Sequence, residues 1–288
     1  MIPKKIKKLS SYIADMQAGG RLVFSRRQAE QALGILRRPF LDMAERLQKK
    51  GSLIHPRRGF YVIVPPQFMS WGSPPPAWFI DDLMHQEACP YYVGLLKAAE
   101  LHEAAHQAVM EFQVITQKRM PKLRTGRSAI AFYYSKKIAA LESGIEERKT
   151  DTGKMRISSV ELTALDLLRY PRAAGGLDNI ATVLADLGPK LDGNRLALLA
   201  SVFERSVRQR LGYLLTRAGH TRTAEMLLPG LAPTLWVELD PLTANDTEFS
   251  PDPIDRDPRW RVIVRRMPEA ETHDPKSESY LLGAGCGI

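Results

Sequence analysis

A short run of residues on a predicted helix has the composition of a zinc hydrolase motif. His102-Glu103-Ala104-Ala105-His106 reads H-E-x-x-H, a spacing that places two imidazoles on one helix face with a carboxylate between them. In zinc peptidases the imidazoles hold the metal, and the carboxylate is the general base for a metal-bound water. The chemistry that this run could perform is therefore hydrolysis by a regulatory zinc metallopeptidase.

The sequence supplies no convincing third zinc ligand. The extended form of the motif requires Gly and His at two later positions, where Val109 and Phe112 stand. Glu142 or Glu161 could complete a thermolysin-like site, but nothing around either residue marks it as a ligand. A five-position motif with two free positions recurs by accident. We therefore favour the interpretation that His102 and His106 are polar residues near a helix C-terminus, and we expect no metal and no cofactor.

Other catalytic patterns are weaker. Glu147-Arg148-Lys149 matches the Glu-x-Lys half of a nuclease site, but no Pro-Asp pair precedes it at a useful distance, so a solvated charge run is the better interpretation. Asp178 follows two glycines and is explained as a helix cap. The chain has no phosphate-binding Gly-rich loop and no Gly-x-Ser-x-Gly nucleophile turn. We expect a protein that is not an enzyme.

Composition indicates a cytoplasmic protein. The two cysteines, Cys89 and Cys286, agree with a reducing compartment and cannot form a Cys-rich zinc site. No apolar run approaches the ~20 residues needed to span a bilayer, and the N-terminus lacks the apolar core of a signal peptide. We therefore expect no membrane association.

Positive charge is concentrated at the N-terminal end. The first sixty residues hold 14 of the 41 Lys and Arg but only 4 of the 32 Asp and Glu, a net charge of +10, whereas the remaining chain carries −1. Such segregation is typical of a module that binds nucleic acid, because each Lys or Arg near a phosphate releases condensed counterions. A solvated basic tail is the alternative.

Helical periodicity within this basic segment argues against a tail. Apolar residues recur at helical spacing in its first part, so the lysines border a helix with one buried face. Ser25 is the predicted N-cap of a second helix, and Gly51 ends a third. The predicted elements are a helix before Gly19-Gly20, a strand over 21–24, helices over 26–33 and 36–50, and strands over 52–55 and 60–64. This order is typical of a winged helix-turn-helix.

In that architecture the third helix enters the major groove N-terminus first. Arg37 and Arg38 stand at its leading end, where arginine can bond guanine O6 and N7 and contribute ~1–3 kcal/mol of base discrimination. The other basic residues are expected at phosphates, because positioning contacts outnumber reading contacts. The predicted DNA contacts are Lys4, Lys5, Lys8, Arg26, Arg27, Arg37, Arg38, Arg46, Arg57 and Arg58. Winged helices also bind proteins, so a module that only sequesters a protein partner is the remaining alternative.

The rest of the chain predicts a second domain, and the fold class is α+β. We expect a winged helix-turn-helix over 1–66, a stiff polyproline-type linker over 67–76, a larger mixed domain over 77–268 and a flexible tail over 269–288. Helical periodicity and caps predict helices over 92–108, 159–169, 177–187 and 195–218, with a capping box at Ser158 and Glu161. Strands are predicted over 112–116, 129–134, 235–239 and 260–264. The second domain is thus a helical sector flanked by a few strands.

Several blocks of the chain resemble the AbiEi family of bacterial antitoxins. They are GFYVIVP at 59–65, YYVGLL at 91–96 with Ala98-Ala99 and 101–107, FQV at 112–114, ELTALDL at 161–167 and GGLDN at 175–179. The resemblance spans about Ser10 to Val264. The family usually has a small residue at the position of Glu103, and this departure creates the H-E-x-x-H run.

The resemblance implies an antitoxin of a type IV toxin-antitoxin system, a class of phage-defence element. In that family an N-terminal winged helix represses its own operon by binding inverted repeats in double-stranded DNA. The C-terminal domain counteracts a nucleotidyltransferase-like toxin. No catalytic residue carries over from the family.

Overall fold

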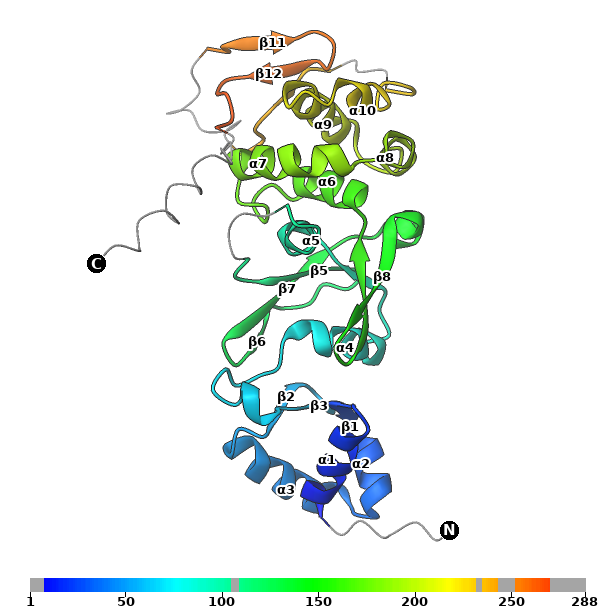
Figure 1. The fold of residues 1–288 in the computed structure, drawn as a ribbon, viewed down its shortest axis with the longest axis vertical. Helices are drawn as coiled ribbons and strands as arrows, with labels where there is room; N and C mark the ends of the chain where they lie inside the picture. The colour runs from blue at the N-terminus through cyan, green and yellow to red at the C-terminus, as the bar shows by residue number, and fades with distance from the viewer. Residues whose placement is uncertain (1–7, 105–108, 232–234, 243–251, 270–288) are drawn as a thin grey trace, which may run out of the picture.

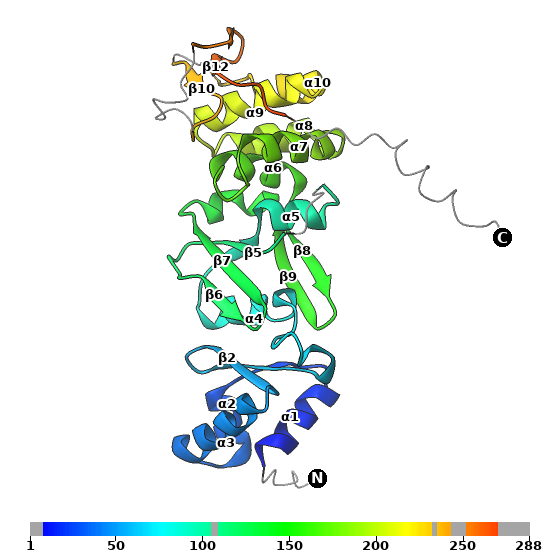
Figure 2. The ribbon, with the colours of Figure 1, turned by 90° about the vertical axis from the view of Figure 1, so that its left-hand side faces the viewer.

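The structure is a computed structural model that describes residues 8–104, 109–231, 235–242 and 252–269. It is an elongated α+β molecule, as the sequence predicts, with the N-terminal helices at one end and the last strands at the other (Figures 1 and 2). A six-stranded sheet lies between them. Within the described ranges, every helix is too short or too polar to cross a membrane.

The N-terminal module comprises residues 8–64. Its elements are α1 (Leu9–Ala18), β1 (Val23–Ser25), α2 (Arg26–Leu33), α3 (Arg37–Lys49), β2 (Leu53–Arg57) and β3 (Phe60–Ile63). The order of these elements is the predicted one. A capping box opens α2, because the Ser25 hydroxyl accepts the Gln28 N–H at 3.2 Å and the Gln28 side chain accepts the Ser25 N–H at 2.7 Å. Gly34 ends α2 at φ 64°, a left-handed conformation that favours glycine.

The central strand of this module is buried on both faces. β3 pairs antiparallel with β1 on one side and β2 on the other. Because successive side chains of a strand point to opposite faces, Tyr61 and Ile63 join the core beneath the three helices. Phe60 and Val62 instead pack in a second core with α4 (Ile80–Gln86) and the central sheet. Residues on both sides of position 66 thus share one core.

The connector after the module folds back on itself. The sequence predicts a non-helical, polyproline-type linker, and this expectation is wrong where 3-10 turns form at Pro66–Phe68 and Pro76–Trp78. Proline is tolerated at the start of a helical turn, because its missing N–H would be unpaired there. The Phe68 ring packs edge-on against Trp78 with centroids 5.0 Å apart. Gly72 also packs against Gly126. A Cβ on Gly126 would lie 2.1 Å from the Trp71 carbonyl oxygen, so this contact requires glycine at position 126.

The central sheet has the strand order β6-β7-β5-β4-β9-β8. Its strands are β4 (Tyr91–Val93), β5 (Phe112–Thr116), β6 (Leu123–Thr125), β7 (Ser128–Tyr134), β8 (Ile145–Thr150) and β9 (Gly153–Ser158). Tyr91 and Val93 face the core of α4, whereas Tyr92 faces the core that contains α5 (Leu95–Leu101). The helix predicted over 92–108 is therefore wrong at its start. A strand buried on both faces has no alternating polarity to identify it.

A helical sector covers the face of the sheet remote from the N-terminal module (Figure 1). It contains α6 (Val160–Arg169), α7 (Leu177–Leu187), α8 (Gly193–Ala200), α9 (Arg205–Arg217) and α10 (Thr221–Glu225). The single helix predicted over 195–218 is wrong, because the chain turns at 201–204 to bury Phe203. The capping serine of α6 is Ser159, which accepts the Leu162 N–H at 3.3 Å, and not Ser158 as predicted.

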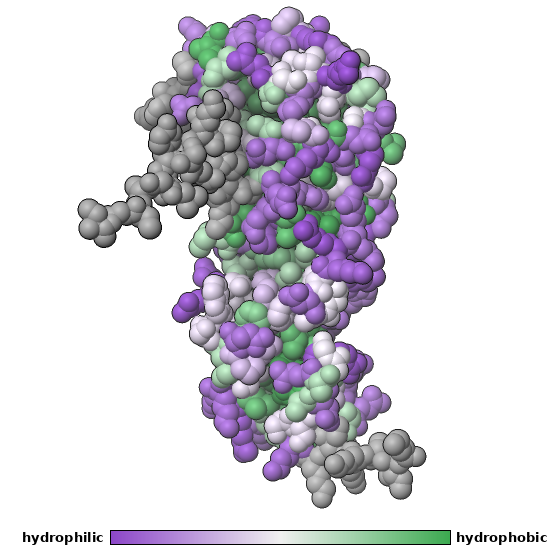
Figure 3. All heavy atoms as spheres, viewed as in Figure 1, coloured by the Kyte–Doolittle hydropathy of each residue, from purple (hydrophilic) through white to green (hydrophobic). Residues whose placement is uncertain are grey.

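The last described strands form a small sheet on α9. Its order is β10-β12-β11, with β10 (Val237–Glu238), β11 (Asp255–Asp257) and β12 (Val262–Val264). Trp260 is fully buried against Gly212, and the Gln209 side chain donates to the Trp260 carbonyl at 2.9 Å. The predicted tail over 269–288 lies outside the described residues after Glu269. Hydrophilic residues cover much of the face drawn in Figure 3.

Candidate nucleic-acid interface

The two predicted base-reading arginines point in different directions. Arg37 and Arg38 are consecutive in the first turn of α3, so their side chains leave the helix about 100° apart. The Arg38 side chain is 89% exposed, and its Nε lies 3.4 Å from an oxygen of Asp42, one turn further along α3. Arg37 instead lines a pocket between the N-terminal module and the rest of the chain.

That pocket, which we call the basic pocket, has a volume of about 650 Å³. Its basic lining residues come from four parts of the chain and are Arg26, Arg27, Arg37, Arg58 and Lys118. Arg26 lies 3.4 Å from Glu30, and Lys118 pairs with Glu87. Arg27, Arg37 and Arg58 have no acidic partner within 4 Å in the part of the chain that the structure describes. Three arginines that line the pocket thus have no ion-pair partner among the described residues, and the one acid in the lining, Glu87, is already paired with Lys118. This excess of positive charge favours an anion.

A histidine holds the turn that carries Arg58. The His55 ring stacks on Tyr61 with centroids 4.4 Å apart, and its Nε2 accepts the Gly59 N–H at 3.0 Å. Partial desolvation lowers the pKa of His55, which favours the neutral imidazole that can accept this bond. Gly59 adopts φ 76°, so the turn requires a residue that tolerates positive φ. The β2–β3 turn therefore has a fixed shape.

The same turn also contacts the larger part of the chain. Arg57 donates to the Pro121 carbonyl at 3.4 Å, and the Gln86 side chain donates to the Arg58 carbonyl at 3.3 Å. Arg57 is half-buried as a result, whereas Arg58 is exposed. Of these two predicted DNA contacts, Arg58 is the one that reaches the basic pocket.

The other predicted contacts lie around the N-terminal module. Lys8 is exposed immediately before α1, and Arg46 is exposed on α3. Lys4 and Lys5 lie outside the described residues. Arg46 lies eight residues beyond Arg38, so the two side chains leave α3 about 80° apart. The exposed side of this helix thus presents Arg38 and Arg46.

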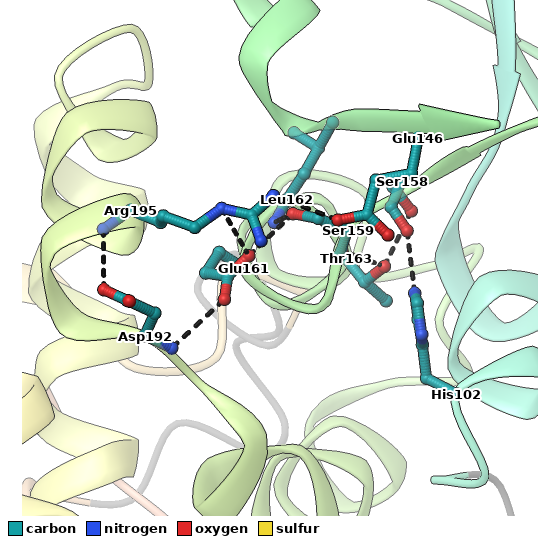
Figure 4. Close-up of polar contacts among 9 residues, drawn as sticks. All are labelled: His102, Glu146, Ser158, Ser159, Glu161, Leu162, Thr163, Asp192 and Arg195. Carbon is teal, nitrogen blue, oxygen red and sulfur yellow. Dashed lines mark hydrogen bonds and ion pairs between the residues drawn. The ribbon is translucent and has the colours of Figure 1, made fainter.

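The described residues of the H-E-x-x-H run do not lie on a regular helix. α5 ends at Leu101, and Glu103 has φ 57°, so the run does not continue a regular helix. The His102 Nε2 donates to the Ser158 carbonyl at 2.7 Å (Figure 4). His106 lies outside the described residues. The described residues contain no group of three or more His, Cys, Asp or Glu that could hold a metal.

Both carboxylates considered as a third ligand have structural partners. Glu161 is buried and accepts the Ser159 hydroxyl at 2.7 Å and the Asp192 N–H at 3.1 Å (Figure 4). It therefore links the start of α6 to the start of α8. Glu142 binds Arg156 through both oxygens at 2.6 Å. Neither carboxylate is free to bind a metal without breaking these contacts.

The two remaining acidic candidates also form ion pairs. Glu147 lies on the exposed β8–β9 hairpin and pairs with Lys154 at 2.6 Å, in line with the predicted solvated charge run. Asp178 does not cap α7, because Gly176 occupies the N-cap position. It accepts instead from Arg266 at 2.7 Å and from the Glu269 N–H at 2.9 Å. Asp178 thus attaches the last described residues to α7.

Comparison with known proteins identifies a domain in the middle of the chain. Residues 92–217 match the family model described as AbiEi antitoxin C-terminal domain. This part of the chain belongs to the AbiEi antitoxin family. The AbiEi domain runs from β4 to the end of α9 and includes most of the central sheet. The resemblance drawn from the sequence is confirmed over these residues.

A solved structure shares the fold of the AbiEi domain and its flanking elements. It is the RV2827C protein from Mycobacterium tuberculosis, which matches with a TM-score of 0.64 and 17% identity. The alignment covers 88% of this chain and 90% of that chain, so the likeness extends to the N-terminal module. A search of curated proteins gave no match.

The AbiEi domain carries a basic segment that the sequence analysis missed. Residues 118–127 hold five Lys and Arg and no acid. Arg127 lies over the Trp71 ring at 5.8 Å, Arg119 over the Tyr134 ring at 5.0 Å, and Arg124 is exposed. The segment adjoins the β2–β3 turn through Pro121. The sequence contains a signal for this segment, because seven Lys and Arg and no acid stand between Glu111 and Glu142. The net charge of −1 for all residues after position 60 conceals this local excess of positive charge.

Proposed function

We propose that this chain is the antitoxin and operon autorepressor of a type IV, AbiE-like toxin-antitoxin system. In this proposal the N-terminal module is a winged helix-turn-helix that binds inverted repeats in its own operator. The AbiEi domain counteracts a nucleotidyltransferase-like toxin and performs no catalysis itself. The antitoxin assignment is supported by the family match over residues 92–217.

The observation that carries the DNA-binding part is the basic pocket. Arg27, Arg37 and Arg58, which have no ion-pair partner among the described residues, line it beside the leading end of α3. Such an arrangement is unfavourable without a counter-charge, and a DNA backbone supplies phosphates in this position when α3 enters the major groove. In this proposal the DNA backbone therefore lies against the pocket.

We propose that the predicted contacts have two different roles. In this proposal Arg38 and Arg46, which are exposed on α3, reach the base edges. Arg37, in the pocket with Arg27 and Arg58, faces phosphate. Bidentate arginine contacts to guanine carry sequence information, whereas phosphate contacts carry affinity and register. We therefore assign base reading to Arg38 and positioning to Arg37.

A gel-shift series with DNA from upstream of the chain's own gene tests this assignment. The triple variant R27A/R37A/R58A should bind weakly at all sequences, and the slope of log K against log salt should fall by about 3, at about 0.9 per lost phosphate contact. A matched control, R217A/R222A/R256A, removes the same charge at the opposite end of the molecule from exposed positions. Equal binding by the two triple variants would contradict the proposed interface.

The antitoxin half is tested separately by co-expression with the toxin. The full-length R27A/R37A/R58A chain should still rescue growth, because the AbiEi domain is unchanged. Loss of rescue with normal expression would show that antitoxin activity requires the DNA-binding surface, and would contradict the proposed division of labour.

A further inference from the structure

An exposed leucine stands at the leading end of α3. Leu36 immediately precedes the helix, and its side chain is 81% exposed. The neighbours Arg38 and Pro39 are exposed as well, whereas Phe40 is fully buried. Leu36 thus takes no part in the core that fixes the helix, and it stands two residues before Arg38, the arginine to which we assign base reading.

Leu36 is also a poor choice for its backbone position. It is the N-cap residue of α3, with extended backbone at φ −80° and ψ 166°, and its side chain makes no capping hydrogen bond. Ser, Thr, Asn and Asp are strongly favoured at an N-cap, because their oxygen accepts an otherwise unpaired N–H. The capped start of α2 at Ser25 shows that the same module uses this chemistry elsewhere.

Position 36 therefore violates two local rules, one on capping and one on exposed apolar side chains. Residues that conflict with local stability without a compensating contact are expected at functional sites. When a helix enters the major groove with its N-terminus leading, its N-cap and first-turn side chains reach base edges. The apolar group that the major groove presents there is the C5-methyl group of thymine.

We infer that Leu36 is a specificity residue that contacts the C5-methyl group of a thymine adjacent to the base read by Arg38. This inference rests on the proposed function and adds to it the identity of one base in each half-site. A serine at position 36 could cap α3 but offers no apolar surface to a thymine methyl group. In this inference, leucine makes α3 less stable than serine would, and in return it discriminates between bases.

The variant L36S tests the inference in the full-length chain, because it should change stability and binding in opposite directions. With the cap restored, the midpoint of thermal unfolding should rise by roughly 2–3 °C. Affinity for the duplex that the chain protects upstream of its own gene should fall about tenfold, while affinity for unrelated duplex DNA stays the same. A structural role for Leu36 would lower stability and affinity together.

Deoxyuridine substitution identifies the thymine. Each thymine of the protected duplex is replaced in turn by deoxyuridine, which removes only the methyl group. At one position in each half-site the wild-type chain should lose about fourfold in affinity, the loss expected for one buried methyl-sized group. The L36S chain should be insensitive to that same replacement, which shows that methyl and side chain are coupled.

The possible results separate this inference from the proposed function. Specific binding that L36S leaves unchanged, or a loss in L36S that couples to no thymine, overturns the role of Leu36 and leaves the repressor function standing. Absence of any sequence-specific binding by the wild-type chain overturns both.

Discussion

The rings of Phe60 and Tyr61, consecutive residues of β3, lie in different hydrophobic cores. Tyr61 packs among the helices of the N-terminal module, where its ring lies edge-on to Phe40 at 5.2 Å. Phe60 packs with Phe79 and Met84, which belong to the α4 region. One strand therefore contributes side chains to two cores, so we expect a substitution on either face of β3 to destabilise both.

We expect F60A to destabilise the whole chain rather than the N-terminal module alone. Truncation of a buried Phe typically costs about 3–5 kcal/mol, and here the cavity opens in the core shared with the central sheet. Thermal unfolding followed by circular dichroism should show one transition, shifted to lower temperature. The conservative F60L should cost under about 1.5 kcal/mol. Two separate transitions in F60A would contradict the shared core.

The separation of Arg37 from Arg38 predicts different defects for the single variants. R38A should lose about 1–3 kcal/mol at its cognate base pair and discriminate less against substitutions there. R37A should weaken binding to all sequences and reduce the salt slope by about 0.9. Gel shifts with operator and unrelated duplexes over a salt series distinguish the two. Identical specificity profiles for R37A and R38A would contradict the assignment.

A buried carboxyl makes stability depend on pH. Asp166 is fully buried in α6 and accepts the Tyr92 hydroxyl at 2.8 Å. Burial raises its pKa to about 7 against the opposing effects of this hydrogen bond and of Arg169. Between about pH 4 and pH 7 the folded chain therefore holds a proton that the unfolded chain has lost.

Because the folded state binds more protons in this window, the free energy of unfolding should fall as pH rises through it. The loss from this group is at most about 4 kcal/mol. D166N retains an acceptor for Tyr92 and removes the titration, so the difference between wild type and variant should vary across the window. Chemical denaturation at several pH values measures it. Parallel stability curves would show that Asp166 does not titrate as expected.

Close packing of Gly212 against Trp260 predicts that G212A displaces the last sheet. A Cβ at this position would meet the Trp260 ring at 2.2 Å, so the ring must move despite the higher helix propensity of alanine. We expect a net loss of about 1–2 kcal/mol and a red shift of tryptophan emission. The control is G153A, because nothing lies within 4 Å of a Cβ at Gly153. An unshifted emission spectrum in G212A would contradict this packing.

The contacts of Glu161 and His102 predict that the purified chain contains no stoichiometric zinc. His102 is hydrogen-bonded to the Ser158 carbonyl, and Glu161 links α6 to α8. Metal analysis of the native protein, with and without added zinc before dialysis, tests this. One zinc per chain that is lost in H102A would support the metallopeptidase alternative instead.

Elements whose signals are local could be predicted from the sequence. The cap at Ser25 and the glycine at position 34 define α2 to the residue, because both act on the backbone within one turn. The region after Tyr92 could not be predicted in this way. Burial of Tyr92 in one core and Val93 in the other depends on elements distant in sequence, so the strand over 91–93 has no local signal that distinguishes it from the helix that follows.

The residues that the N-terminal module contributes to the candidate site could be predicted, but the arrangement of the site could not. Charge placement identifies Arg26, Arg27, Arg37 and Arg58 from the sequence. Their convergence with Lys118 in one pocket depends on how the AbiEi domain packs against the N-terminal module. Lys118 lies sixty positions beyond Arg58, and no local pattern relates the two.

Because both faces of β3 are buried, the strand also determines where the chain can be cut to make a chimera with a related protein. A transplant that ended at residue 66 would carry Phe60 and Val62 without α4, and would leave apolar side chains of both proteins in water. A chimera designed to exchange the N-terminal module should instead replace the chain through Gln86, so that β3 is transferred together with the helix that covers it.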